Sequence, residues 1–158
     1  MSTMFDRAQM MCRGEVPPPP VAALIGFTLT SITPGRATIA FEASERHVNP
    51  MGTLHGGVLC DIADAAMGMA FASTLEEGET FTTLELKINF LKPFWRGRLM
   101  AVAHVVKAGR TVGFVECDVT DDHERLVARA TSTCMTLRGE QANPQLSQYG
   151  PSQGPRPW

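Results

Sequence analysis

The chain has 158 residues, of which 44% are hydrophobic and 19% are charged, as expected for one soluble globular domain with a sizeable core. The formal net charge of −2 and the pI near 6.1 give no indication of a nucleic-acid partner. The four cysteines lie far apart without a C-x-x-C pair, which favours reduced thiols in a cytoplasmic protein over disulfides or a zinc site.

The first twenty residues are predicted to form a short helix and a proline-rich linker. An amphipathic pattern predicts a helix over Phe5–Cys12, ended by Gly14 and by the run Pro17–Pro20, which cannot continue a helix. Residues 1–15 contain acids and no long apolar run, so we expect no secretory signal. The main domain is therefore expected to span residues 21–138.

Six strands and one long helix are predicted within that domain. The stretch "GFTLTSITPGRATIAFEAS" indicates a hairpin that turns at Pro34-Gly35, and a helix is expected at about residues 57–75. In "TLELKINFL" the apolar residues Leu84, Leu86, Ile88 and Phe90 alternate with polar ones, which predicts a strand. Residues 98–137 predict three more strands, with turns near 108–109 and 121–122. The tail, residues 139–158, is rich in Gln, Pro, Ser and Gly and is predicted to be disordered.

The order of these elements predicts the fold class. One apolar helix followed by a continuous antiparallel sheet is best packed when the sheet wraps around the helix. The prediction is therefore an α+β protein with the hotdog fold.

Two carboxylates, Asp61 and Asp64, interrupt an otherwise apolar helix. They argue against a membrane span, since each would cost roughly 2.5–3.5 kcal/mol at a bilayer centre. On a helical wheel Asp64 lies opposite the main apolar face, on a side without Lys, Arg, Glu or Gln. We expect a second subunit to cover this side, which would desolvate Asp64 and favour a general base with a raised pKa. A solvated polar face or a structural ion pair is the alternative. The other residues on this side are Cys60, Met67, Gly68 and Phe71.

The loop "HVNPMGTLHGG" leads into the helix and offers a second candidate feature. A helix N-terminus carries unpaired N–H donors and a positive dipole end, and Gly56 and Gly57 allow another molecule to approach it closely. Such a donor suits a carbonyl oxygen that becomes an oxyanion. A plain turn at the glycines and a structural role for His55 are equally compatible with the spacing.

Three segments resemble the PaaI-like (phenylacetate-pathway) branch of the hotdog acyl-CoA thioesterases. They are "ERHVNPMGTLHGGVLCDIADAAMGMA", "TTLELKINFLKP" and "VARATSTCMTL", and with the hairpin the resemblance covers about residues 21–138. It implies hydrolysis of an acyl-CoA to free acid and CoA, without a cofactor or a metal. It also implies a homodimer or homotetramer whose active sites are shared between subunits.

The resemblance also implies roles for individual residues. The general base or nucleophile falls on Asp64, and the backbone N–H that polarises the thioester carbonyl falls on Gly56. Asn49 matches the residue that holds the carbonyl or the attacking water, His55 matches the adjacent histidine, and Thr83 matches a hydroxyl that positions the water. Asp61 falls on a variable position.

The CoA phosphates require cationic contacts, and the substrate-binding residues are expected to include Gly57, Lys92 and Arg110. For most of the basic residues a solvated strand edge is the alternative role. The full set of basic candidates is Lys87, Lys92, Arg96, Arg98 and Arg110.

Two other functions are alternatives to thioester hydrolysis. A hotdog hydratase is disfavoured because the loop and helix lack an Asp-x-x-x-x-His pattern, and a non-catalytic acyl-CoA-binding module would not need Asp64. No G-x-S-x-G, P-loop, G-x-G-x-x-G or H-E-x-x-H motif indicates a different enzyme. We expect a cytoplasmic protein with no nucleic-acid or membrane partner.

Overall fold

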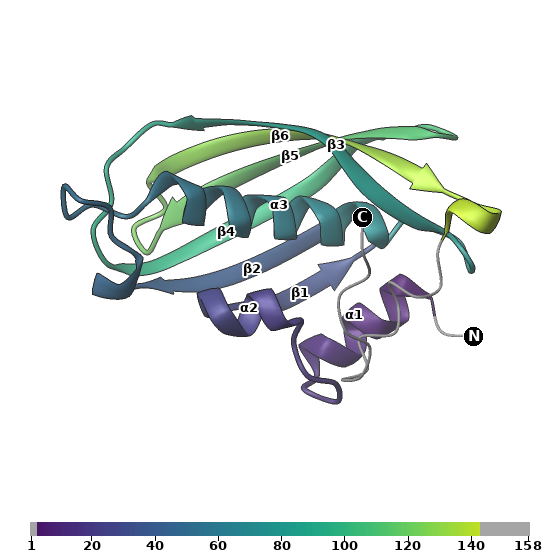
Figure 1. Ribbon diagram of the computed structural model, residues 1–158, viewed down its shortest axis with the longest axis horizontal. Helices are drawn as coiled ribbons and strands as arrows, with labels where there is room; N and C mark the ends of the chain where they lie inside the picture. Colours follow the sequence, from purple (N-terminus) through teal and green to yellow (C-terminus); the bar gives the residue numbers. More distant parts are fainter. Residues whose placement is uncertain (1–2, 143–158) are drawn as a thin grey trace, which may run out of the picture.

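A curved antiparallel sheet wraps around one long helix, as the sequence predicts (Figure 1). The structure is a computed structural model and describes residues 3–142. The central helix α3 spans Gly56–Ala72, and two shorter helices, α1 and α2, lie beside strand β1 at one edge of the sheet. No helix in the described part of the chain is long and apolar enough to cross a membrane.

The sheet has six strands in the order β1-β2-β4-β5-β6-β3, and every neighbouring pair is antiparallel. The predicted turns at Pro34-Gly35 and near residues 108–109 and 121–122 are confirmed. β3 follows the helix but pairs with the last strand, β6, so it forms an edge of the sheet. The strand bounds are β1 Phe27–Thr33, β2 Arg36–Ala43, β3 Thr80–Phe90, β4 Gly97–Ala108, β5 Val112–Asp121 and β6 Leu126–Leu137.

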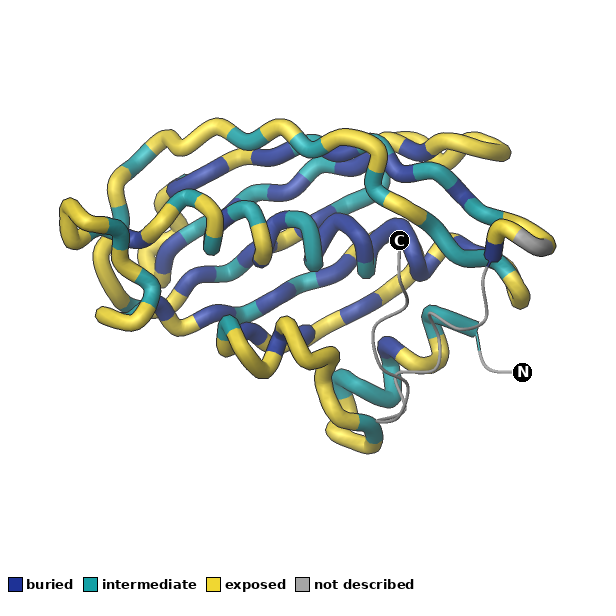
Figure 2. The backbone as a smooth tube through the Cα atoms, viewed as in Figure 1, coloured by how far each residue is buried: buried dark blue, intermediate teal, exposed yellow. Residues whose placement is uncertain are grey.

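The core lies between α3 and the inner face of the sheet, where the buried residues gather (Figure 2). Small residues meet at this contact: Ala63, Ala66 and Ala70 of α3 are fully buried, as are Ala101 and Ala103 of β4. Small side chains let the helix backbone lie close to the strands, where dispersion contacts are dense. The fold thus holds α3, which carries Asp61 and Asp64, rigidly against the sheet.

The side of α3 that carries the carboxylates is covered partly by the chain itself, which corrects one expectation. Met67, Gly68 and Phe71 are buried within the single chain and need no second subunit to cover them. The ring of Phe71 meets the edge of Phe81 from β3 at a centroid distance of 5.7 Å. A helical wheel assumes one buried face, whereas this sheet surrounds most of the helix.

The N-terminal segment packs on the sheet edge. Helix α1, Met4–Cys12, begins at a capping box formed by Thr3 and Asp6, and its Ala8 is buried against β1 and α3. Helix α2, Pro20–Ile25, was not predicted: the proline run does not continue a helix, but its last residue starts one. Proline fits there because the first turn of a helix needs no N–H donor.

The chain continues past β6 as a short 3₁₀-helix, Gly139–Gln141. The rest of the predicted tail, residues 143–158, lies outside the described residues. The domain boundaries drawn from the sequence stay a prediction.

Candidate active site

The structure brings Asp64 of α3 and Thr83 of β3 together. The Thr83 hydroxyl donates a hydrogen bond to Asp64 Oδ1 at 3.2 Å, and both side chains are half-buried. Burial raises the pKa of the Asp64 carboxyl, the Thr83 hydrogen bond lowers it, and the nearby charge of Asp61 raises it again. The net direction is upward, so this carboxyl is a better proton acceptor than an ordinary aspartate.

A β-bulge in β3 aims Thr83 at the helix. The register of β3 on β6 shifts between Thr83 and Glu85, and Leu84 is the extra residue. Before the bulge Thr83 faces inward opposite buried Cys134, and after it Leu86 faces inward opposite buried Ser132. The strict alternation expected for this strand is therefore wrong at Leu84, which is 54% exposed. The bulge places a polar side chain, in an otherwise apolar inner row, beside Asp64.

Asp61 and Asp64 line a cleft of about 930 Å³ between α3 and the N-terminal segment. Sequence reasoning missed the N-terminal residues of this cleft, because no local pattern shows that α1 and the prolines fold back against α3. The lining includes Met11, Gly14, Glu15, Val16, Pro17, Pro18, Pro19, Val21, Ala22, Phe27, Leu29, Ile39, Ala65 and Met69.

The start of α3 carries the second half of the predicted site. His55 is the N-cap, and its Nδ1 accepts the Gly57 N–H at 2.8 Å, so a neutral His55 ring carries its proton on Nε2. The Gly56 N–H has no acceptor within residues 3–142 and is free to bind an oxygen. A Cβ at Gly56 would lie 2.8 Å from Cζ of Phe90, so a larger residue here would require the Phe90 ring to move.

Asn49 stabilises the loop that leads to this helix start. Its Oδ1 accepts the N–H groups of Met51 at 2.9 Å and Thr53 at 3.2 Å, and its Nδ2 donates to the Thr53 hydroxyl at 2.8 Å. These bonds hold residues 49–53 in a tight turn. In the single chain the Asn49 amide therefore faces its own loop.

The two halves of the site lie apart within one chain. Gly56 and Asp64 are eight residues apart on α3, which corresponds to about 12 Å along the helix axis. Reacting groups must come within about 3–3.5 Å of each other. The Gly56 N–H and Asp64 of one chain therefore do not lie side by side, which argues that they act on different thioester carbonyls.

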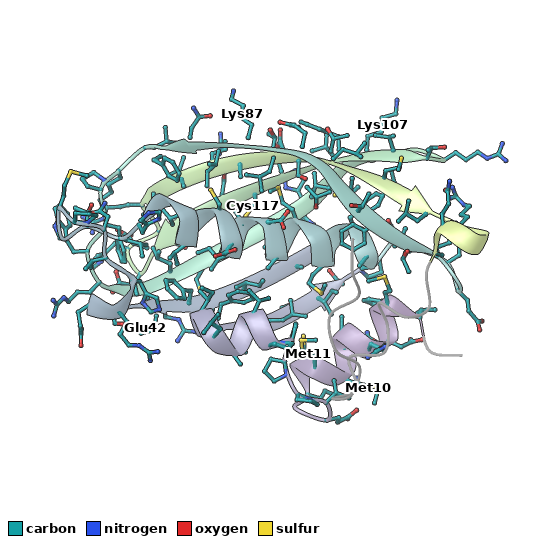
Figure 3. The ribbon with its side chains drawn as sticks, in the orientation of Figure 1. Met10, Met11, Glu42, Lys87, Lys107 and Cys117 are labelled. Atoms are coloured by element: carbon teal, nitrogen blue, oxygen red, sulfur yellow. The ribbon has the colours of Figure 1, made fainter. Side chains whose placement is uncertain are left out.

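The basic residues predicted to bind CoA lie in different places. Lys92 Nζ binds Oδ2 of Asp121 at 2.6 Å, and Arg125 Nε binds the same oxygen at 2.9 Å. Arg110 is exposed and shares a small depression with Phe71, which places it at the opposite end of α3 from Gly56. Lys87 points away from α3 on the outer side of the sheet (Figure 3). Lys92 thus has a structural partner, and none of the three adjoins the Asp64–Thr83 pair.

No three His, Cys, Asp or Glu side chains gather in a metal-binding arrangement between residues 3 and 142. All four cysteines are free thiols.

Comparison with known proteins places the chain in a family. The model of the "Thioesterase superfamily" matches residues 51–128. Human acyl-coenzyme A thioesterase 13 is 32% identical over 109 residues, which are 68% of this chain and 77% of that protein. The chain belongs to the thioesterase superfamily. This assignment confirms an enzyme that hydrolyses thioesters.

Further relatives of this thioesterase agree with that assignment. The 1,4-dihydroxy-2-naphthoyl-CoA hydrolase of Listeria monocytogenes is 30% identical over 69% of this chain and 89% of its own length. A phenylacetic acid degradation-related protein from Ralstonia eutropha has a TM-score of 0.74 and 35% identity, covering 81% of this chain and 98% of its own. The Escherichia coli PaaI protein, at 22% identity and a TM-score of 0.76 over 87% and 98% of the two chains, shows the same fold. The predicted α+β hotdog fold and PaaI-like resemblance are thus confirmed.

Proposed function

We propose that this thioesterase hydrolyses an acyl-CoA to the free acid and CoA at a site shared between two subunits. The observation that carries the proposal is the pairing of half-buried Asp64 with Thr83 on an apolar cleft. The acyl-CoA substrates named for relatives support the CoA part of the proposal. The sharing follows from the separation of Gly56 and Asp64 along α3.

Each residue has a role in the reaction. The Gly56 N–H of one subunit binds the thioester carbonyl oxygen and stabilises the negative charge that develops on it. Asp64 of the other subunit takes a proton from a water that attacks the carbonyl carbon, or its carboxylate attacks that carbon directly. When water attacks, the C–S bond then breaks, the CoA sulfur leaves and takes up the proton held by Asp64, and the acid is released. When the carboxylate attacks, departure of the CoA thiolate leaves an acyl–Asp64 anhydride. Water hydrolyses this anhydride to the acid and free Asp64, and a proton from that water neutralises the thiolate.

The other site residues position these groups. Thr83 holds one oxygen of the Asp64 carboxylate, and the free oxygen then faces the reacting water. His55 fixes the first turn of α3 by accepting the Gly57 N–H, which leaves the Gly56 N–H exposed for the substrate. Asn49 keeps the preceding loop in shape, and Gly57 allows the substrate to approach the helix start.

The experiment that tests this function compares two nearly isosteric variants. Asp64→Asn removes the proton acceptor, whereas Asp61→Asn removes a charge from the same cleft without touching Thr83. Release of CoA from a panel of acyl-CoAs is followed with a thiol reagent. Activity that falls with Asp64→Asn and persists with Asp61→Asn supports the proposal. The reverse order, or no effect of either, contradicts it.

A further inference from the structure

The cleft beside Asp64 has an apolar floor and an unusual second wall. Phe27, Leu29 and Ile39 of the sheet are buried at its base, and Ala65 and Met69 lie on the α3 side. The opposite wall consists of residues from the N-terminal segment, from Met11 at the end of α1 (Figure 3) to Ala22 in α2. This wall is built from chain that precedes the part matched by the thioesterase family model.

The charges of the cleft restrict what can enter it. Among residues 3–142, its lining contains the carboxylates Glu15, Asp61 and Asp64 but no Lys, Arg or His. Glu15 at the rim is paired with Arg13, whose Nε lies 2.7 Å from Oε1. The phosphates of CoA, or an acyl group that ends in a carboxylate, would meet the negative charge of Asp61 and Asp64, beside which no cation lines the described part of the cleft.

The size of the cleft points to its occupant. A volume of about 930 Å³ lies at the upper end of the range for drug-sized ligands, about 300–1,000 Å³. An acetyl group would leave most of this apolar surface uncovered. A longer aliphatic or aromatic acyl group would cover it and gain the free energy of apolar burial.

We propose that this cleft holds the acyl group of the substrate and that the N-terminal wall, residues 11–22, selects neutral apolar acyl groups of medium length. The inference rests on the proposed acyl-CoA hydrolysis, because Asp64 connects the cleft to the reacting carbonyl. The thioester end lies at Asp64, and the acyl chain extends between Met69 and Val16. The CoA part stays outside the cleft.

The first test measures kcat/KM of the wild-type enzyme for acetyl-, butyryl-, octanoyl- and decanoyl-CoA. Each added methylene is expected to raise kcat/KM roughly threefold until the cleft is filled, since its burial stabilises the bound state. Succinyl-CoA, which has the four-carbon chain of butyryl-CoA with a terminal carboxylate, is expected to react roughly tenfold more slowly than butyryl-CoA.

The second test changes the N-terminal wall. Val16→Lys is expected to lower kcat/KM for decanoyl-CoA roughly tenfold and to lower it far less for acetyl-CoA. It should also reduce the ratio of kcat/KM for butyryl-CoA to that for succinyl-CoA. Leu24→Lys is the matched control, because Leu24 is 74% exposed on α2 and does not line the cleft. Ala65→Leu fills the cleft from the α3 side and should also act selectively on the long substrate.

The outcomes separate the two proposals. If the wild-type enzyme hydrolyses none of these acyl-CoAs, the proposed function fails, and the inference fails with it. If it hydrolyses them at rates that do not depend on chain length, only the inference fails. The inference is likewise overturned if Val16→Lys slows acetyl-CoA as much as decanoyl-CoA while Ala65→Leu is unselective, or if Leu24→Lys matches Val16→Lys.

Discussion

Asp64 shows how a single carboxyl is tuned by its neighbours. Desolvation against α3 and β3 disfavours its charged form, and Asp61 adds repulsion, while the Thr83 hydroxyl stabilises the charge. The sequence predicted the raised pKa but assigned the desolvation to a second subunit. In the structure the single chain already provides it. The family resemblance identified Asp64 and Thr83 from the sequence. Their contact depends on the β-bulge at Leu84, which no sequence pattern predicts.

Replacing Asp64 with asparagine is expected to abolish turnover and to stabilise the fold at neutral pH. Turnover should fall roughly a hundredfold or more, because the amide neither accepts a proton from water nor attacks a thioester. A folded-state pKa above the ordinary aspartate value means that stability falls as the pH rises through that range. Asp64→Asn should therefore melt higher than wild type at neutral pH, with the gap closing at acid pH. A lower melting temperature at neutral pH would contradict the desolvated carboxylate.

The acid limb of the pH–rate profile is expected to move in opposite directions in two variants. Asp61→Asn removes a repulsive charge, so the pKa of Asp64 should fall and activity should persist to lower pH. Thr83→Val removes the stabilising hydrogen bond, so the limb should move to higher pH. The measurement is kcat/KM against pH for both variants and wild type. If the acid limb of both variants coincides with that of the wild type, a group other than Asp64 controls the activity at low pH.

At the scale of the elements, local patterns predicted most of the fold and long-range pairing supplied the rest. The periods of the hydrophobic residues located α3 and the strands, and turn residues located the hairpins. They could not show that β3 lies beside β6, that Leu84 is a bulge, or that Pro20 starts a helix. The position of β3 and the bulge depend on pairing with residues distant in the sequence. The helix at Pro20 was missed because proline can either end a helix or occupy its first turn. The same holds for the candidate site. Asp64 was predicted from the sequence, whereas the N-terminal wall of the cleft, which depends on contacts between distant segments, was not.

The turn between β5 and β6 is held by a buried carboxylate whose loss is expected to destabilise the protein. Asp121 is contacted by Lys92 and Arg125 and accepts the N–H groups of His123 and Arg125, and these contacts hold its pKa well below the usual range. This stabilisation is present above the ordinary aspartate pKa and is lost as the pH falls toward the folded-state value. Asp121→Asn should lower the melting temperature by several degrees at neutral pH, and progressively less in acid.

The control for that variant is the adjacent Asp122→Asn, whose side chain is largely exposed. Thermal melts of both variants and wild type over a pH series measure the difference. Equal effects of the two substitutions would contradict a specific role for Asp121. Because Lys92 is held by Asp121, we expect it to contribute to the fold rather than to CoA binding.

At the scale of the whole molecule, one chain carries two separate halves of the proposed active site. The free N–H at Gly56 and the Asp64–Thr83 pair lie two helical turns apart, and β3 is an edge strand with no partner on its outer side among residues 3–142. In a dimer, the Gly56 N–H of each copy would meet the Asp64–Thr83 pair of the other copy. We therefore expect a dimer or larger oligomer at micromolar concentration. Light scattering that gives a single species of 17.2 kDa would contradict this.

The central claim, an active site shared between subunits, is tested most directly by mixing two inactive variants. Asp64→Asn lacks the proton acceptor. Gly56→Pro lacks the N–H donor, and its geometry is compatible with the first position of a helix because His55 has φ −66° and ψ 131°. Gly56→Ala is the control, since it brings a Cβ toward Phe90 but keeps the N–H.

Mixed dimers of Asp64→Asn and Gly56→Pro subunits are isolated with two affinity tags, and CoA release is measured. If Asp64 and Gly56 act from different subunits, each mixed dimer contains one site with both native groups and one with neither. The account predicts about half of the wild-type activity per mixed dimer, from two parents that are each nearly inactive. Mixed dimers as inactive as their parents would show that one chain supplies both groups, and would contradict the shared site.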